Sequence, residues 1–291
     1  MPAVITASVA EAFLEVLLYG AYIVFFAGVV YLFRIRRGKQ PAALWVLLGL
    51  VVHFLAITGH WIITLYKSFY IAVNLGGGCG VEVFLSPSSP SSVAQVTFLL
   101  MTTLITDSLV IQRLYVICAD RRLVWFPLIL LVAQAVCGGA TLYNFITADL
   151  EALSTGWVTA NLVLAIVVSV YSTALIFRKM WGVTRNISEH FSGGSRLTSV
   201  LVIIVESAAI QSLTAIGALI AYQTSSIGQV FYSGIVPVLL GLSTILIYMR
   251  VGLGWAHDSA REIGSGSNLR ISFGANDALG EDYELHNRSG K

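Results

Sequence analysis

The chain has 291 residues, of which 57% are hydrophobic and 11% are charged, and its formal net charge is +2. Soluble domains carry about 25% charged residues, so this composition, with a mean hydropathy of +0.83, excludes an ordinary water-soluble domain. The basic residues form no single patch, so nucleic acid is not an expected partner.

Seven long apolar segments follow one another along the chain, at 11–33, 42–66, 93–118, 123–145, 157–178, 198–222 and 229–250. Each exceeds the ~20 residues that a helix needs to cross about 30 Å of hydrocarbon. We therefore predict an all-α fold, a polytopic bundle of seven transmembrane helices within residues 1–254, in contact with the lipid bilayer. Residues 255–291 contain few large apolar side chains and are expected to form a disordered cytoplasmic tail.

Basic residues are concentrated in every second connection between these segments. They are Arg34, Arg36, Arg37 and Lys39 after the first segment, Arg121 and Arg122 after the third, and Arg178, Lys179, Arg185 and Arg196 after the fifth. The intervening connections hold one base, Lys67. By the positive-inside rule, we expect the N-terminus outside and the C-terminus in the cytoplasm. The plasma membrane is the default location for this topology, and the endoplasmic reticulum is the alternative.

Acidic and histidine side chains inside the segments are the first candidates for function, because burying them in a bilayer is expensive. Glu11 and Glu15 lie near the outer end of the first segment, where we expect water to reach them. His53 of the second segment and Asp107 of the third lie at nearly the same depth, counted at 1.5 Å per residue, so we expect them to be in contact. Two interpretations stay open. The contact is a structural hydrogen bond, or His53, His60 and Asp107 form a ligand-binding or proton site that faces a cavity.

A second pair of charged residues falls in the cytoplasmic half of the bundle. Arg113 lies on the third segment and Glu206 on the sixth. The long Arg113 side chain can extend toward the interface, whereas Glu206 lies deeper and needs a partner more. The pair is expected to be a structural interhelical ion pair or, alternatively, a conformational switch.

The sequence contains no recognisable metal-ligand cluster, nucleophile constellation or cofactor motif, so we expect neither an enzyme nor a bound metal or cofactor. A retinal protein needs a Schiff-base lysine inside a helix, whereas the lysines here fall in predicted loops, at a helix end or in the tail. His53 and His60 are seven residues apart, about 10 Å along a helix, which is too far to bind one metal ion. An internal repeat of the kind found in many secondary transporters is not evident.

Three stretches together carry a resemblance to a known group. Residues 107–117 read Asp-Ser-Leu-Val-Ile-Gln-Arg-Leu-Tyr-Val-Ile, residues 206–209 read Glu-Ser-Ala-Ala, and Pro237 leads to Arg-Val-Gly-Leu-Gly at 250–254. As a set, they resemble a large group of seven-helix integral membrane proteins from mushroom-forming (basidiomycete) fungi, over the third to the seventh segment. That group has no assigned activity. The resemblance therefore implies a topology and a fungal origin, but no chemistry.

The chain is also topologically similar to G-protein-coupled receptors in helix number and orientation. It departs from their largest class in three places: Gln112 precedes Arg113 where an acid is expected, the last helix lacks Asn-Pro-x-x-Tyr, and the third helix lacks an outer cysteine. These departures argue against G-protein coupling. The leading hypothesis is receptor- or sensor-like binding of a small or lipophilic ligand, with a cytoplasmic signalling partner. A proton-coupled transporter and a structural membrane scaffold are the alternatives.

Overall fold

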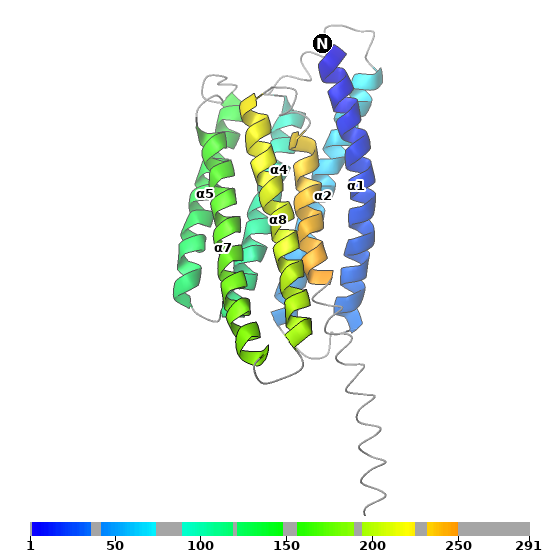
Figure 1. The fold of residues 1–291 in the computed structure, drawn as a ribbon. Helices are drawn as coiled ribbons and strands as arrows, with labels where there is room; N and C mark the ends of the chain where they lie inside the picture. Colours follow the sequence, from blue (N-terminus) through cyan, green and yellow to red (C-terminus); the bar gives the residue numbers. More distant parts are fainter. Residues whose placement is uncertain are drawn as a thin grey trace, which may run out of the picture. The chain divides into compact units, whose positions relative to one another are not determined.

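The computed structural model describes residues 2–35, 42–73, 89–118, 121–147, 156–188, 194–224 and 232–249. Within these ranges it describes no side chains for residues 2–8, 35, 42–44, 72, 117–118, 121, 180, 182–188 and 194–208. Seven long helices account for nearly all of the described residues. They are α1 (Pro2–Ile35), α2 (Ala42–Val73), α4 (Pro90–Cys118), α5 (Arg121–Thr147), α7 (Trp157–Ser188), α8 (Gly194–Thr224) and a C-terminal helix, Tyr232–Met249. The predicted all-α, seven-helix bundle is confirmed (Figure 1). The predicted tail, 255–291, lies outside the described residues.

Six of the helices are long and apolar enough to cross a membrane. These spans are Val9–Arg34, Trp45–Ile71, Pro90–Val116, Arg122–Thr147, Trp157–Lys179 and Tyr232–Met249. The helix α8 is not among them, and much of its predicted segment, 198–222, falls where side chains are not described. A helix suits lipid because it satisfies its backbone hydrogen bonds internally. The chain is therefore a polytopic helical membrane protein.

Several helices extend beyond the apolar segments that predict them. The first begins at Pro2 rather than at residue 11, and α7 continues to Ser188 rather than ending at 178. Lys67, which we expected in a loop, lies within α2 because that helix continues to Val73. Hydropathy marks the part of a helix that suits lipid, whereas polar turns can continue the helix beyond the hydrocarbon.

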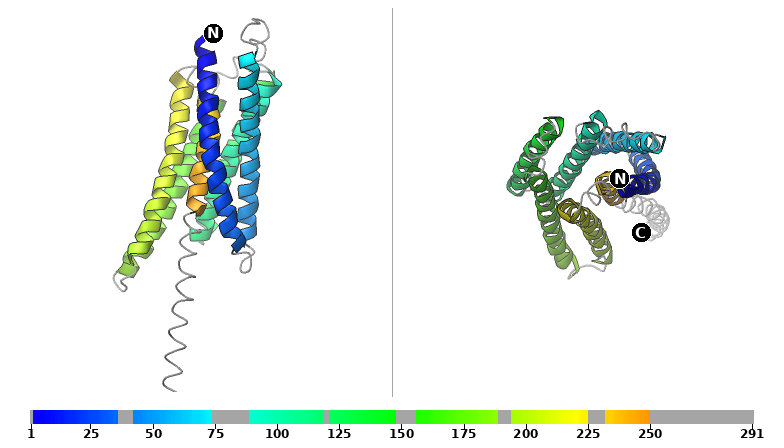
Figure 2. Two further views of the ribbon diagram at one scale, coloured as in Figure 1. Left: turned by 90° about the vertical axis from the view of Figure 1, so that its right-hand side faces the viewer. Right: turned by 90° about the horizontal axis from the view of Figure 1, so that it is seen from above.

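Helices adjacent in the sequence pack side by side around the bundle, and α4 also packs against α7. The C-terminal helix lies among the others in the view from above (Figure 2). Its span is 61% buried, against 33% or less for each of the other five spans. The close packing depends on Gly241, which leaves room for Ile57 of α2 and Tyr22 of α1.

The main apolar core joins the C-terminal helix to α1, α2 and α4. Its fully packed members are Tyr19, Tyr22, Val29, Leu50, Ile57, Leu109, Val238 and Ile245. Large apolar side chains such as Phe13, Trp45, Phe69 and Trp125 point outward instead. An apolar exterior around a core that also contains polar residues is the arrangement expected when lipid surrounds the bundle.

Candidate functional site

Asp107 of α4 is the centre of a polar contact between three helices. Its side chain is buried, and each carboxylate oxygen accepts one hydrogen bond. Gln134 Nε2 of α5 donates to Oδ2 at 2.9 Å, and Gln211 Nε2 of α8 donates to Oδ1 at 3.3 Å. A buried carboxylate is costly unless it is hydrogen-bonded, so these two amides stabilise Asp107 and tie α5 and α8 to α4.

The contact that we expected between His53 and Asp107 does not form. His53 Nε2 lies 3.0 Å from Thr106 Oγ1 instead. The Thr106 hydroxyl already donates to the Thr102 carbonyl at 2.8 Å, so His53 Nε2 carries the proton and donates to Thr106. Successive residues on a helix point about 100° apart. Thr106 therefore contacts α2, while Asp107 points toward α5 and α8.

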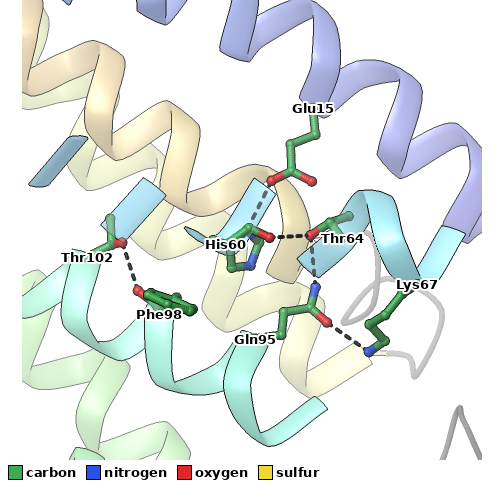
Figure 3. Close-up of polar contacts among 7 residues, drawn as sticks. All are labelled: Glu15, His60, Thr64, Lys67, Gln95, Phe98 and Thr102. Atoms are coloured by element: carbon green, nitrogen blue, oxygen red, sulfur yellow. Dashed lines mark hydrogen bonds and ion pairs between the residues drawn. The ribbon is translucent and has the colours of Figure 1, made fainter. Parts of the chain in front are cut away.

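His60 pairs with a residue that the sequence placed in water. Its Nδ1 lies 3.0 Å from Oε1 of Glu15 on α1, and both side chains are fully buried (Figure 3). The expectation that water reaches Glu11 and Glu15 is therefore wrong, because both point into the bundle. Glu15 lies 13 residues after the start of α1, and His60 lies 13 residues before the end of α2. Antiparallel packing brings the two residues to the same depth.

A chain of hydrogen bonds continues from this pair to α4. Thr64 Oγ1 donates to the His60 carbonyl, Gln95 Nε2 donates to Thr64 Oγ1 at 3.4 Å, and Lys67 Nζ donates to Gln95 Oε1 at 2.9 Å (Figure 3). Lys67 Nζ also donates to Ser92 Oγ at 3.1 Å. These contacts join α2 to α4 near the end of the bundle at which α1 begins, called the N-terminal side below.

Glu11 completes this group from α1. It interacts electrostatically with Lys67 and with Glu15, one helical turn further along α1. Its carboxylate packs directly against Gly234 of the C-terminal helix, where any larger side chain would displace it. We call Glu11, Glu15, His60 and Lys67 the N-side cluster.

Arg113 contacts the C-terminal helix near the other end of the bundle. One guanidinium nitrogen donates to the Thr244 carbonyl at 3.1 Å, and Cζ lies 4.0 Å from the centroid of the Tyr248 ring. Glu206, its expected partner, lies on α8, but its side chain is outside the described part of the chain. The ion pair between Arg113 and Glu206 stays a prediction.

A small cavity lies beside Asp107 and Gln211, bounded by α4, α7, α8 and the C-terminal helix. Its volume is about 30 Å³, whereas pockets for small organic ligands have roughly 300–1,000 Å³. Most of its lining is apolar, including Leu162, Ala165 and Leu240. A ligand larger than one or two water molecules would have to separate these helices in order to bind here.

Neither the cavity nor the polar contacts point to a metal centre. Among the residues that the structure describes, no group of three or more His, Cys, Asp or Glu side chains could hold a metal ion.

The most important residue that the sequence reasoning misplaced is Glu15. A signal for its inward position was present: Glu11, Glu15, Tyr19 and Tyr22 recur at spacings of four, four and three, so they share one helix face. All four are buried. Gln134 carried no comparable signal, because it is an isolated polar residue in an apolar segment.

Comparisons of the chain with protein-family models, with curated proteins and with solved structures find no match. Its function therefore has to be inferred from the polar contacts themselves.

Proposed function

We propose that this protein is a non-enzymatic, receptor- or sensor-like membrane protein, in which movement of α4 carries the response. The observation that supports it is the set of polar contacts along α4. At three depths, α4 side chains bind α2 through Gln95 and Thr106, α5 and α8 through Asp107, and the C-terminal helix through Arg113. A shift of this one helix would alter contacts with four others.

The cavity beside Asp107 supports a site that opens when helices move, rather than a preformed ligand pocket. It lies where α4, α7 and α8 meet, and it is too small for an organic ligand. A small lipophilic ligand would enter between these helices and bind one position of α4 more tightly than another. The bound protein would then shift toward the conformation that binds the ligand more tightly. The basic connections would then present the response to a cytoplasmic partner, most simply at the plasma membrane.

The resemblance of residues 107–117 to fungal seven-helix proteins includes both Asp107 and Arg113. If the chain belongs to that group, these two positions on α4 would be part of what its members share. The group supplies no activity, so the proposal depends on the contacts of α4.

Asp107→Asn tests the proposal, since asparagine presents one oxygen to two glutamine donors. We would place spin labels at Val116 of α4 and Trp181 of α7, both exposed, in a background without Cys79, Cys118 and Cys137. For the full chain in lipid nanodiscs, we expect a folded variant and a distance distribution with two maxima whose proportions differ from those of the parent. Ser108→Ala, on the outward side of α4, is the matched control.

Two other outcomes would contradict the sensor proposal. A lower melting temperature with an unchanged distance distribution would indicate a structural scaffold. A folded variant that loses proton flux present in proteoliposomes of the parent protein would indicate a proton-coupled transporter.

A further inference from the structure

The N-side cluster places four ionisable side chains from two helices inside the bundle. Glu11, Glu15 and His60 are at most 3% exposed, and Lys67 is partly buried. The sensor proposal makes no use of Glu11, Glu15 or His60. Four such groups in one place are unexpected in a membrane-spanning bundle, where ionisable residues are rare and usually functional.

Two atoms of the cluster are buried without a partner among the described residues. They are Glu15 Oε2 and His60 Nε2, the outer atoms of the hydrogen-bonded pair. Buried polar atoms without a hydrogen bond cost about 1–3 kcal/mol each, and such atoms call for a functional explanation. An ionised carboxylate oxygen can accept a proton, and an imidazole nitrogen can accept or donate one. Both open positions can therefore exchange a proton.

The charges of the cluster balance only when one proton is added. Two ionised carboxylates and one ammonium group give −2 + 1 = −1 if His60 is neutral. Packed around them are neutral partners: Ser92 and Gln95 of α4, Gly234 of the C-terminal helix, and the Tyr19 hydroxyl, which is hydrogen-bonded to Thr58. A net charge in such surroundings is costly. One additional proton on the histidine or on a carboxylate brings the sum to zero.

The cluster lies close to the end of the membrane spans. Glu11 is two residues inside the span that begins at Val9, and Lys67 is four residues before the end of the next span, Trp45–Ile71. These separations correspond to about 3 and 6 Å along a helix. Glu11 and Lys67 therefore place the outer part of the cluster near the solution on the N-terminal side, the shorter way for a proton to reach Glu15 and His60.

We infer that Glu11, Glu15, His60 and Lys67 form a binding site for one exchangeable proton that enters from the N-terminal side. The proton moves from solvent to a carboxylate or to the imidazole, and no covalent bond other than the O–H or N–H bond forms. The cluster contacts α4 through Gln95, which binds both Thr64 and Lys67. A role of the proton as stimulus rests on the proposed function, whereas the binding of the proton does not.

The test is nuclear magnetic resonance of the full chain in nanodiscs, labelled with ¹⁵N at its five histidines. The ring nitrogen signals that disappear in His60→Gln belong to His60. If the cluster shares one proton, Glu15→Gln, which removes a negative charge, moves the His60 ring toward its neutral form. Lys67→Met, which removes a positive charge, moves the ring toward its doubly protonated form.

The two variants act in opposite directions, and Lys67 is seven residues from His60 on α2. A purely local hydrogen bond between Glu15 and His60 would respond to Glu15→Gln alone. If Lys67→Met leaves the ring signals unchanged, the shared-proton site is refuted. Where Glu15→Gln does not fold, Glu11→Gln replaces it, with the same expected direction.

Ser108→Ala is the control, because Ser108 lies on the outward side of α4 and donates its hydrogen bond to the Leu104 carbonyl of the same helix. The ring signals of His60 are expected to stay unchanged in this variant, and a change in them would contradict an isolated site. The distance measurements across α4 and α7 are independent of these spectra, so failure of the sensor proposal and failure of the proton site are distinguishable.

Discussion

Polar residues that are adjacent in the sequence form hydrogen bonds with different helices in this bundle. Substitution of a single side chain can therefore test each hydrogen bond separately. Thr106 and Asp107 are adjacent in sequence, yet one contacts α2 and the other contacts α5 and α8. Depth in the membrane follows from counting residues, whereas the direction of a side chain depends on how the helix is rotated. For this reason, the sequence correctly predicted a similar depth for His53 and Asp107, but the predicted contact between them was wrong.

The pair of Glu15 and His60 is expected to stabilise the bundle cooperatively. Replacing either residue with alanine leaves the other buried without its partner, while the double replacement removes both. In a double-mutant cycle, we expect a coupling of about 0.5–3 kcal/mol in the free energy of unfolding, because the two groups share one bond. Additive effects of the two single changes would show that the hydrogen bond contributes nothing.

The contact between Arg113 and Tyr248 leads to a second prediction about single side chains. The guanidinium lies over the ring, and the Tyr248 hydroxyl has no partner among the described residues. Tyr248→Phe should therefore leave the free energy of unfolding unchanged or slightly improved. Tyr248→Leu should lower it by about 1–2 kcal/mol through loss of the cation–π contact, as measured by unfolding in mixed micelles. Equal effects of Phe and Leu would contradict a contribution from the ring face.

Among the elements, the C-terminal helix depends most on close packing. A methyl group at Gly241 would lie 2.5 Å from Ile57 Cδ1 and 2.7 Å from a Tyr22 ring carbon, whereas one at Gly20 of α1 would meet nothing within 4 Å. We expect Gly241→Ala to lower the free energy of unfolding by about 1–3 kcal/mol because it overpacks the core. Gly20→Ala serves as the matched control and should be neutral or stabilising. A neutral Gly241→Ala would mean that the helix can move outward at little cost.

The existence of the helices was predictable, but their ends and faces were less so. Apolar runs of this length are suited to cross the hydrocarbon of a bilayer, and a helix satisfies the backbone hydrogen bonds there. The order of the seven helices therefore followed directly from the sequence. The sequence did not predict residues 2–10 as helical, because they add about two and a half turns without adding a continuous apolar run. The inward face of α1 was readable from the spacing of Glu11, Glu15, Tyr19 and Tyr22. By contrast, no local pattern could reveal that Gln134 and Gln211 meet at one carboxylate, because that depends on the packing of three helices.

For the whole molecule, the distribution of basic residues predicts which side each end occupies. The seven crossings that the sequence predicts would place the two ends on opposite sides, and the positive-inside rule predicts that the N-terminus lies outside. We expect an epitope tag at Met1 to be stained in intact cells, and a tag after Lys291 to be stained only after permeabilisation. Staining of both tags, or of the second alone, in intact cells would overturn this topology. Staining of the second tag alone would also reverse the side from which a proton reaches the N-side cluster.

The position of the C-terminal helix has a consequence for biosynthesis. In the apolar core its partners are on α1, α2 and α4, so the last of the described helices to leave the ribosome packs against those made first. Until Tyr232–Met249 arrives, Glu11 has no Gly234 to pack against and Arg113 has no Thr244 carbonyl to bind. These side chains of the early helices therefore gain these contacts only after Tyr232–Met249 has been made, and insertion of this helix completes the apolar core of α1, α2 and α4.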